Sequence, residues 1–268
     1  MASLNSSGIR AILLLCAFVV ATSAMALSSF GRGNAGNSKR AMPAKPLDAS
    51  RILQRYLDAT GGRDAWGRVH SRVSKGVVEI PDMHMAGTAE LFEKAPDRAL
   101  VKMVVSGVTF LEGFDGTTAW SSDPKDGLQE QRGLQLEETR RESDFRYPLD
   151  LPNLYKGVSS ASPEKIGDRP VYVLELTPPE GGEPDRAYFD TQTGFLTRTV
   201  IQHHDNDGSV KPFEEDYGDY RAVDGVKVPF MIRQAGSQVD FVIRLNEVRQ
   251  NVELDDAQFS MPASSVVK

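Results

Sequence analysis

Cysteine is nearly absent from this sequence. Its single cysteine, Cys16, lies in a short apolar run, residues 11–21, and no later stretch of the 268 residues stays apolar for the roughly 20 residues that a membrane-spanning helix needs. If residues 1–26 are removed on export, the remaining chain has no thiol. Disulfide bonds and thiol chemistry are then excluded for it.

Motifs of catalysis and cofactor binding are missing as well. The sequence contains no glycine-rich phosphate loop, no G-x-S-x-G turn and no H-E-x-x-H zinc motif, and it has only four histidines. We therefore expect no catalytic residue, no metal ion and no cofactor. One enzymatic alternative stays open, a hydrolase in which a serine, a histidine and an acid converge only in the folded chain.

Positive charge is not in excess either. Lysine and arginine number 31 against 37 aspartates and glutamates, which gives a formal charge of −6. Proteins that bind nucleic acids concentrate positive charge for their contacts with phosphates. We therefore expect no nucleic-acid partner.

The N-terminus has the pattern of a secretory signal peptide, residues 1–26. Arg10 precedes the apolar run, and Ala24 and Ala26 supply small residues at the two positions that a signal peptidase reads. We expect cleavage after Ala26 and a periplasmic location for the mature chain. Leu15 stands before Cys16 where a lipoprotein signal has a small residue, so lipidation is not expected. A membrane anchor is the alternative, for which the apolar run is short.

The rest of the chain predicts one folded domain. Residues 27–46 are rich in Ser, Gly, Asn, Ala, Lys and Arg, a composition that predicts a disordered linker. Residues 47–262 predict the domain itself, and residues 263–268 a flexible tail. Within the domain, Asp48 or Ser50 is expected to cap a helix that ends at the glycine pair 61–62, with apolar residues at helical spacing, namely Ile52, Leu53, Tyr56 and Leu57.

Short strands follow the helix in quick succession. Breaks rich in Pro, Gly and Asp separate runs of alternating apolar and polar residues, a pattern that indicates an antiparallel meander rather than βαβ units. The expected strands are 72–80, 87–94, 99–105, 109–114, 117–121, 158–166 and 170–177. Residues 130–155 interrupt this rhythm, and they predict one helix near 136–145 followed by a proline-broken apolar segment. We expect this insert to plug the sheet or cover its mouth, with Leu149, Leu151, Leu154 and Tyr155 as lid residues.

Residues 186–245 predict a curved antiparallel sheet with one apolar face. Residues 190–194 and 224–225 have the Asp and Gly that tight hairpin turns require. Side chains along a strand alternate between the two faces, so every second residue should point to the same side. The apolar strand residues that we single out, in this sheet and in the strands before it, are Val101, Met103, Trp120, Leu174, Leu176, Phe189, Phe230, Ile232, Phe241 and Ile243. Trp120 stays open between core and cavity, whereas Trp66 is expected in the core.

Polar motifs in the chain have simpler explanations than chemistry. His203 and His204 suggest a metal site, but adjacent residues of a strand point to opposite faces and make a poor chelating pair. Residues 205–208 are rich in turn formers and predict a hairpin turn. The acidic runs 214–216 and 255–256 are expected to be solvated.

Several segments together resemble a known family. They occur in order behind the predicted signal peptide, at residues 52–62, 115–120, 188–196, 219–230 and 254–262. They resemble the bacterial outer-membrane lipoprotein-sorting proteins related to LolA and LolB, over about residues 48–262. The resemblance implies a mainly β (α+β) fold, a half-open antiparallel β-barrel with an N-terminal helix and a helical lid or plug insert. It also implies an apolar cavity for acyl chains, lined by the ten apolar strand residues named above. A lipid or lipoprotein acyl chain as partner and a membrane-bound donor or acceptor protein are implied as well.

One position departs from that family. In LolA an arginine precedes the proline of the turn between the second and third strands and helps to lock the lid, whereas Ala95 holds this place here. The function expected from the whole sequence is that of a periplasmic, non-catalytic carrier or binder of acyl chains or another apolar ligand. The alternative is a structural or interaction domain whose core is filled by its own side chains. A cavity of several hundred cubic ångströms would favour the carrier.

Overall fold

A single antiparallel sheet is the main element of the part of the chain that the structure describes. The computed structural model describes residues 47–204, 209–235 and 239–263. The described residues form fourteen strands in one sheet. These are β1 (Ser71–Ile80), β2 (Met85–Lys94), β3 (Arg98–Val105), β4 (Val108–Phe114), β5 (Ala119–Asp123), β6 (Gly127–Gln131), β7 (Gly157–Ser160), β8 (Glu164–Ile166), β9 (Arg169–Thr177), β10 (Asp185–Asp190), β11 (Leu196–His204), β12 (Val210–Val223), β13 (Val226–Ala235) and β14 (Phe241–Gln250).

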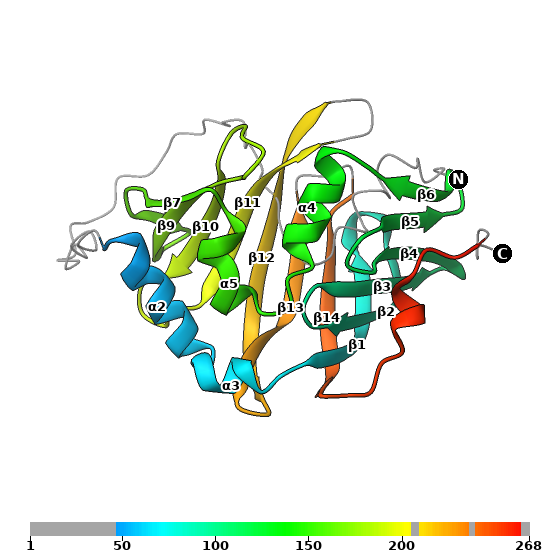
Figure 1. Cartoon of the computed structure of the whole chain (residues 1–268), viewed down its shortest axis with the longest axis horizontal. Helices are drawn as coiled ribbons and strands as arrows, with labels where there is room; N and C mark the ends of the chain where they lie inside the picture. Colours follow the sequence, from blue (N-terminus) through cyan, green and yellow to red (C-terminus); the bar gives the residue numbers. More distant parts are fainter. Residues whose placement is uncertain (1–46, 205–208, 236–238, 264–268) are drawn as a thin grey trace, which may run out of the picture.

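The order of strands divides the sheet into two meanders. One runs from β1 outward to β6, and the other runs from β7 and β9 through β10 to β14. Antiparallel pairing of β1 with β14 joins them. The strands β6 and β7 lie at opposite ends of this order, so the sheet is open, and β8 pairs with β9 outside it. The curved sheet in Figure 1 is thus the half-open antiparallel barrel that the sequence predicted.

Helices lie across this curved sheet. They are α2 (Ala49–Ala59), α3 (Arg63–Gly67), α4 (Leu134–Glu142) and α5 (Tyr147–Leu154), with short 3-10 turns η1 (Pro81–Met83) and η2 (Asp256–Phe259). The Asp48 side chain caps α2 by accepting a hydrogen bond from the Arg51 amide, as predicted. Helix α4 contacts both β11 and β5, so the insert lies between the two meanders (Figure 1).

The hairpin turns have the backbone geometry that their residues predict. Asp224 and Gly225 have positive φ values of 48° and 92°, which a tight two-residue turn requires. In the turn before β11, the Asp190 carboxylate accepts hydrogen bonds from the amides of Gln192 and Thr193. The predicted turn at residues 205–208, the signal peptide, the linker 27–46 and tail residues 264–268 lie outside the described residues.

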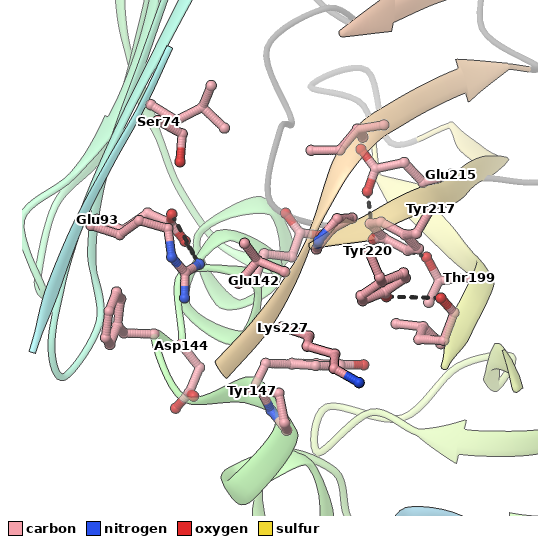
Figure 2. Close-up of a pocket in the computed structure, with 18 of the residues that line it drawn as sticks. Ser74, Glu93, Glu142, Asp144, Tyr147, Thr199, Glu215, Tyr217, Tyr220 and Lys227 are labelled. Atoms are coloured by element: carbon pink, nitrogen blue, oxygen red, sulfur yellow. Dashed lines mark hydrogen bonds and ion pairs between the residues drawn. The ribbon is translucent and has the colours of Figure 1, made fainter. Parts of the chain in front are cut away.

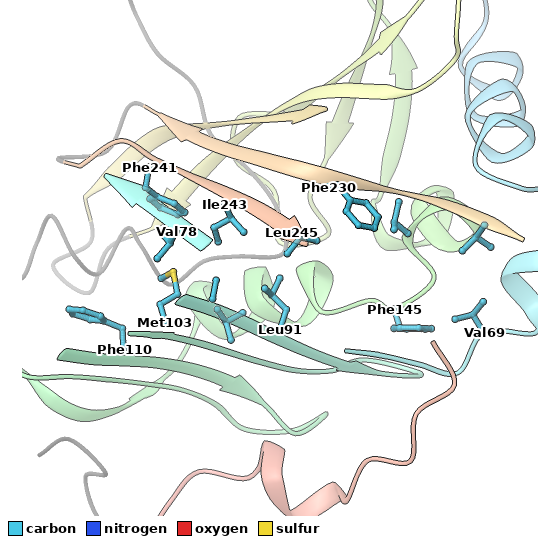
Figure 3. Packing of buried hydrophobic residues seen from close by; sticks show 14 of the residues in the cluster. Val69, Val78, Leu91, Met103, Phe110, Phe145, Phe230, Phe241, Ile243 and Leu245 are labelled. Atoms are coloured by element: carbon cyan, nitrogen blue, oxygen red, sulfur yellow. The ribbon is translucent and has the colours of Figure 1, made fainter. Parts of the chain in front are cut away.

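Buried apolar side chains form two large clusters on the same face of the sheet, which we call the inner face. The first cluster joins β1–β4 to β13 and β14 (Figure 3), and its residues include Val78, Leu91, Val101, Met103, Phe110, Phe230, Phe241, Ile243 and Leu245. The second lies under α2 and α5 and includes Ile52, Tyr56, Leu151, Tyr155, Leu174, Leu176, Ala187, Phe189 and Leu196. The register of the strands places both clusters on one face. Residues directly opposite each other on neighbouring strands point to the same side of the sheet. Such pairs form a continuous row from the second cluster to β13, in the order Ala187, Thr199, Glu215 and Gln234.

Several predicted elements need correction. The helix expected at 136–145 begins and ends earlier, as α4, and the proline-broken segment after it folds as a second helix, α5, with Pro148 in its first turn. Proline is tolerated there because the amide of the first turn has no partner within the helix. The strand expected at 158–166 is two strands, β7 and β8, and the one expected at 117–121 lies at Ala119–Asp123. Strand β6 was not predicted.

Within the described ranges, no helix is long and apolar enough to cross a membrane.

Candidate functional site

A cavity of about 140 Å³ lies on the inner face where the two apolar clusters meet. We call it the seam pocket. Helices α2 and α3, the insert and strands from both meanders contribute to it. Its lining residues are Tyr56, Trp66, Arg72, Ser74, Leu91, Glu93, Glu142, Asp144, Phe145, Tyr147, Pro148, Leu196, Thr199, Glu215, Tyr217, Tyr220, Lys227, Val228, Pro229, Ile232 and Leu245.

Aromatic rings form much of the wall of the seam pocket. They come from α2, α3, the insert and β12, and they are Tyr56, Trp66, Phe145, Tyr147, Tyr217 and Tyr220. Packing holds several of them in place. The ring of Tyr56 meets Phe189 edge-on with centroids 5.3 Å apart, and Tyr220 stacks on Phe195 at 4.3 Å while its hydroxyl donates to the Leu196 carbonyl. The wall is therefore fixed and largely aromatic.

One arginine is already held by these rings. The guanidinium carbon of Arg72 lies 5.5 Å from the ring centroid of Trp66 and 5.1 Å from that of Phe145. The same guanidinium pairs with Glu93 at 3.3 Å. Cations bind aromatic faces through the ring quadrupole, so the pocket contains a built-in example of this interaction.

Carboxyl groups line the pocket together with the rings. In the view of Figure 2, Glu142 lies between Glu93 on one side and Glu215 with Tyr217 on the other. The Tyr217 hydroxyl donates to Glu215 at 2.6 Å. Glu142 is 8% exposed, and its Oε1 has no hydrogen-bond partner in the described part of the chain. Burial, and next the nearby Glu138, raise the pKa of Glu142 well above its usual value.

Helix α4 turns polar side chains toward the sheet. Thr139 donates to Gln131 at 2.5 Å, and Gln131 donates to the buried Glu112 at 2.6 Å. Burial raises the pKa of Glu112 to about 8. The buried Arg141 pairs with Glu180 at the outer end of the same region. The insert is thus attached to the sheet by polar contacts at α4 and by apolar contacts at α5.

The two adjacent histidines meet one carboxylate. The Nδ1 atom of His203 lies 3.0 Å from Glu138 of α4, and Nδ1 of His204 contacts the same carboxylate. The expectation that the two rings point apart is therefore wrong at this strand end. Across the residues that the structure describes, no group of three or more His, Cys, Asp or Glu side chains could hold a metal ion.

The structure distributes the predicted cavity residues over both clusters. Val101, Met103, Phe230, Phe241 and Ile243 lie in the first cluster, and Leu174, Leu176 and Phe189 in the second. Of all ten, Ile232 alone lines the seam pocket. Among the predicted lid residues, Leu149 packs against the first cluster, and Leu151, Leu154 and Tyr155 join or pack against the second.

Trp120 lies apart from the other predicted cavity residues. Its cross-strand neighbour is Gly113, which pairs with Leu100, whereas Val101 points to the inner face, so Trp120 lies on the outer face. There its indole donates to the Phe259 carbonyl of η2 at 2.8 Å. Trp66 is buried in the first cluster, as expected.

Reasoning from the sequence missed the polar part of the site. The acidic run 214–216 was expected to be solvated, but Glu214 and Glu215 are buried, while Asp255 and Asp256 are exposed as expected. Alternation in β12 held a usable signal, because Glu215 and Tyr217 are two residues apart and share a face. No such signal existed for Glu142, whose position depends on where the insert rests.

A backbone hydrogen bond joins the insert to the turn between β2 and β3. The turn that carries Ala95 is joined to the insert by a hydrogen bond of 2.9 Å from the Phe145 amide to the Pro96 carbonyl. The insert is therefore attached to this turn without an arginine at position 95.

These features define a half-open antiparallel barrel with a helical insert, the architecture that the resemblance implied. A scan of the sequence against protein-family models finds no match. A search among curated proteins also finds none.

Solved structures do show likenesses to this chain. It is similar to a DUF1329 family protein from Desulfovibrio piger, with a TM-score of 0.51 and 14% identity over 79% of this chain and 96% of that one. It is also similar to an outer membrane lipoprotein-sorting protein domain from Vibrio parahaemolyticus, with a TM-score of 0.47 and 13% identity over 78% and 94% of the two chains. A LolA superfamily protein from Nitrosomonas europaea matches with a TM-score of 0.49 and 14% identity over 80% and 98%. At these identities the likeness is one of fold.

Proposed function

We propose that this chain is a periplasmic carrier or binder of acyl chains or another apolar ligand, and that it acts without catalysis. The observation that carries the proposal is the inner face. Apolar side chains of both meanders point into one space, and the insert α4–α5 fills that space where a closed barrel or sandwich would have further strands. The seam pocket contains Ser74 but no histidine in its lining, which gives a hydrolase no support.

Acyl-chain binding sets an energetic requirement that this face can meet. Removing a chain of about 16 carbons from water is worth roughly 0.8 kcal/mol per CH₂, or about 12 kcal/mol. A carrier must supply apolar surface whose contact with the chain contributes a similar free energy, and it must also release the chain. The seam pocket, at about 140 Å³, is smaller than the roughly 300–1,000 Å³ of ligand pockets. Entry of a chain therefore requires the insert to move.

The composition of the insert suits such a movement. Leu151 and Tyr155 occupy the second cluster, where they stand in for an acyl chain. Helix α4 buries Glu138, Arg141 and Glu142 instead of large apolar side chains. Its contacts with the sheet are polar, so α4 can stay in place while the apolar part of the insert is displaced. In the proposed cycle the ligand replaces the apolar part of the insert, and the insert returns when the ligand leaves.

A second candidate is a structural or interaction domain with a self-filled core. It is favoured by one observation, the small volume of the seam pocket beside two well-filled clusters. The two candidates differ in whether the insert is ever displaced.

The test is ligand binding by protein purified from the periplasm without detergent. Native mass spectrometry and lipid extraction should find a bound lipid, or the protein should take up a fluorescent fatty acid. Ile232→Trp fills the seam pocket and should reduce uptake, whereas Val77→Trp, a matched change at a residue 38% exposed on the opposite face of β1, should leave it unchanged. Absence of both bound lipid and uptake in the unaltered protein would favour the self-filled domain.

A further inference from the structure

We infer that the seam pocket binds an ammonium head group, so that the apolar ligand is an amphiphile with a positively charged nitrogen. This inference rests on the proposed function and names the chemical class of its ligand. Three features of the pocket carry it: the aromatic wall, one buried carboxyl group without a partner, and the balance of charge around the lining.

The aromatic wall offers several ring faces to a cation. Trp66 and Phe145 already hold the Arg72 guanidinium at 5.5 and 5.1 Å. The lining continues beyond that arginine with Tyr56, Tyr147, Tyr217 and Tyr220. Cages of aromatic rings are a recurring way to bind alkylammonium and quaternary ammonium groups, because the negative face of each ring attracts the cation without requiring a second ion.

A buried carboxyl group supplies the matching acceptor. Glu142 lines the pocket, is only 8% exposed, and has no hydrogen-bond partner for its Oε1 in the described part of the chain. A buried polar atom without a partner is costly and calls for an explanation. The charged groups that act electrostatically on Glu142 are mostly acidic. They are the acids Glu138, Glu112 and Asp185 and one cation, Arg141. Arg141 is itself paired with Glu180. An incoming N⁺–H group would supply the missing donor and the missing positive charge together.

The balance of charge disfavours an anionic head group. The lining contains four acids, Glu93, Glu142, Asp144 and Glu215, against two cations, Arg72 and Lys227. Nη1 of Arg72 is paired with Glu93, its Nε and Nη2 have no hydrogen-bond partner among the described residues, and Lys227 is exposed. A carboxylate or phosphate in the pocket would meet more acids than cations. The volume of about 140 Å³ corresponds to a few water molecules at about 30 Å³ each, which suits a small head group.

The inference is tested by isothermal titration of the full mature chain with amphiphiles of one chain length below their critical micelle concentrations. The probes are dodecylamine, dodecanol and dodecanoate, with dodecyl-chain lyso-phosphatidylethanolamine as a fourth probe that separates a lipid head group from a free amine. We expect dodecylamine to bind about 10- to 100-fold more tightly than dodecanoate, because a hydrogen bond to a charged group is worth about 1.5–3 kcal/mol. Dodecanol should lie between them.

Variants assign the preference to Glu142. Glu142→Gln should remove most of the preference for dodecylamine and leave dodecanol binding unchanged. Glu130→Gln makes the same change of charge at an exposed carboxylate outside the pocket and should have no effect. The comparison of probes on the unaltered protein keeps the test valid even if a variant folds poorly.

The outcomes separate the inference from the proposed function. If dodecanoate binds as tightly as dodecylamine, or if folded Glu142→Gln keeps the preference, the head-group inference is overturned while apolar binding stands. If no probe binds, both are overturned. Tighter binding of lyso-phosphatidylethanolamine than of dodecylamine supports the inference only if Glu142→Gln removes it, and then identifies a lipid as the source of the ammonium group; if Glu142→Gln leaves it, the phosphate or glycerol is recognised and the inference is overturned.

Discussion

At the scale of single residues, the inner face combines apolar packing with buried acids. Burial is the main reason why the pKa is raised to about 8 for Glu112, to about 7 for Asp185 and to about 6 for Asp144. Each of these groups holds its proton to a higher pH in the folded chain than in the unfolded chain. Such a group contributes stability that is fully present below its unfolded pKa and is lost as the pH rises through its folded pKa.

The free energy of unfolding should therefore fall as the pH rises from about 5 to about 8. Each of these acids changes the free energy of unfolding by up to about 1.4 kcal/mol per pH unit between its unfolded and its folded pKa. The effect of Glu112 extends to the highest pH of the three. The Glu112→Gln side chain keeps the acceptor for Gln131 but cannot ionise. The difference in free energy of unfolding between this variant and the unaltered protein should therefore shift in favour of the variant from pH 5 to pH 8. Urea unfolding at several pH values measures this. If the free energy of unfolding of Glu112→Gln changed with pH in parallel with that of the unaltered protein, the prediction would be wrong. Glu130→Gln, at an exposed acid, is the control and should give such a parallel dependence.

A second residue-scale prediction concerns Gly113 of β4. A Cβ atom there would lie 2.4 Å from the ring of Trp120, which is 2% exposed and hydrogen-bonded to Phe259. Since the ring cannot move aside freely, Gly113→Ala should lower the free energy of unfolding by about 1–3 kcal/mol. Gly67→Ala is the control, because nothing lies within 4 Å of its added Cβ. Equal stability of the two variants in urea titrations would show that Trp120 is not held in this position.

At the scale of elements, the insert has two different attachments to the sheet. Helix α5 is attached through Leu151, which is fully buried in the second cluster, while α4 is attached through polar side chains. Apolar burial is the larger contribution of the two, because a polar contact inside the protein replaces one with water. The hold of the insert on the sheet therefore depends mainly on α5.

Leu151→Ala should consequently cost about 2–5 kcal/mol of stability, the range for emptying a buried leucine site. Leu134→Ala, in the same insert at a residue 42% exposed, should stay within about 0.5 kcal/mol of the unaltered protein. Thermal or urea unfolding distinguishes them. A cost for Leu151→Ala no larger than that of Leu134→Ala would mean that α5 is not anchored to the second cluster.

The sequence predicts the strands and their inner faces better than it predicts the insert. Alternation along one strand is a local property, so residues of one strand such as Val101 and Met103 can be assigned to a common face from the order of residues alone. Trp120 cannot, because its strand begins two residues later than expected and its face is set by pairing with Gly113. The burial of Glu215 and the place of Glu142 in the seam pocket depend on contacts between distant segments. Local patterns carry no information about such contacts.

At the scale of the whole molecule, the predicted signal peptide can be tested through its cysteine. The predicted signal peptide contains the only cysteine of the chain, Cys16. The mature protein isolated from the periplasm should therefore begin at Leu27 and show no thiol that reacts with a maleimide, while the precursor shows one. Intact-mass spectrometry measures both quantities. Ala26→Arg should block cleavage and keep the thiol, and a periplasmic protein that retains Cys16 without this change would show that residues 1–26 are an anchor.

The pairing of β1 with β14 has a consequence for how the chain folds during its synthesis. The first strand of the sheet pairs with the second strand on one side and with the last strand on the other. The two meanders therefore cannot join until nearly the whole chain has left the ribosome. Pairings this distant along the chain form slowly. A polypeptide that must cross a membrane unfolded gains time from this delay, because its native sheet cannot be completed ahead of translocation. The order of strands thus delays completion of the native sheet, which is what export through the predicted signal peptide would require.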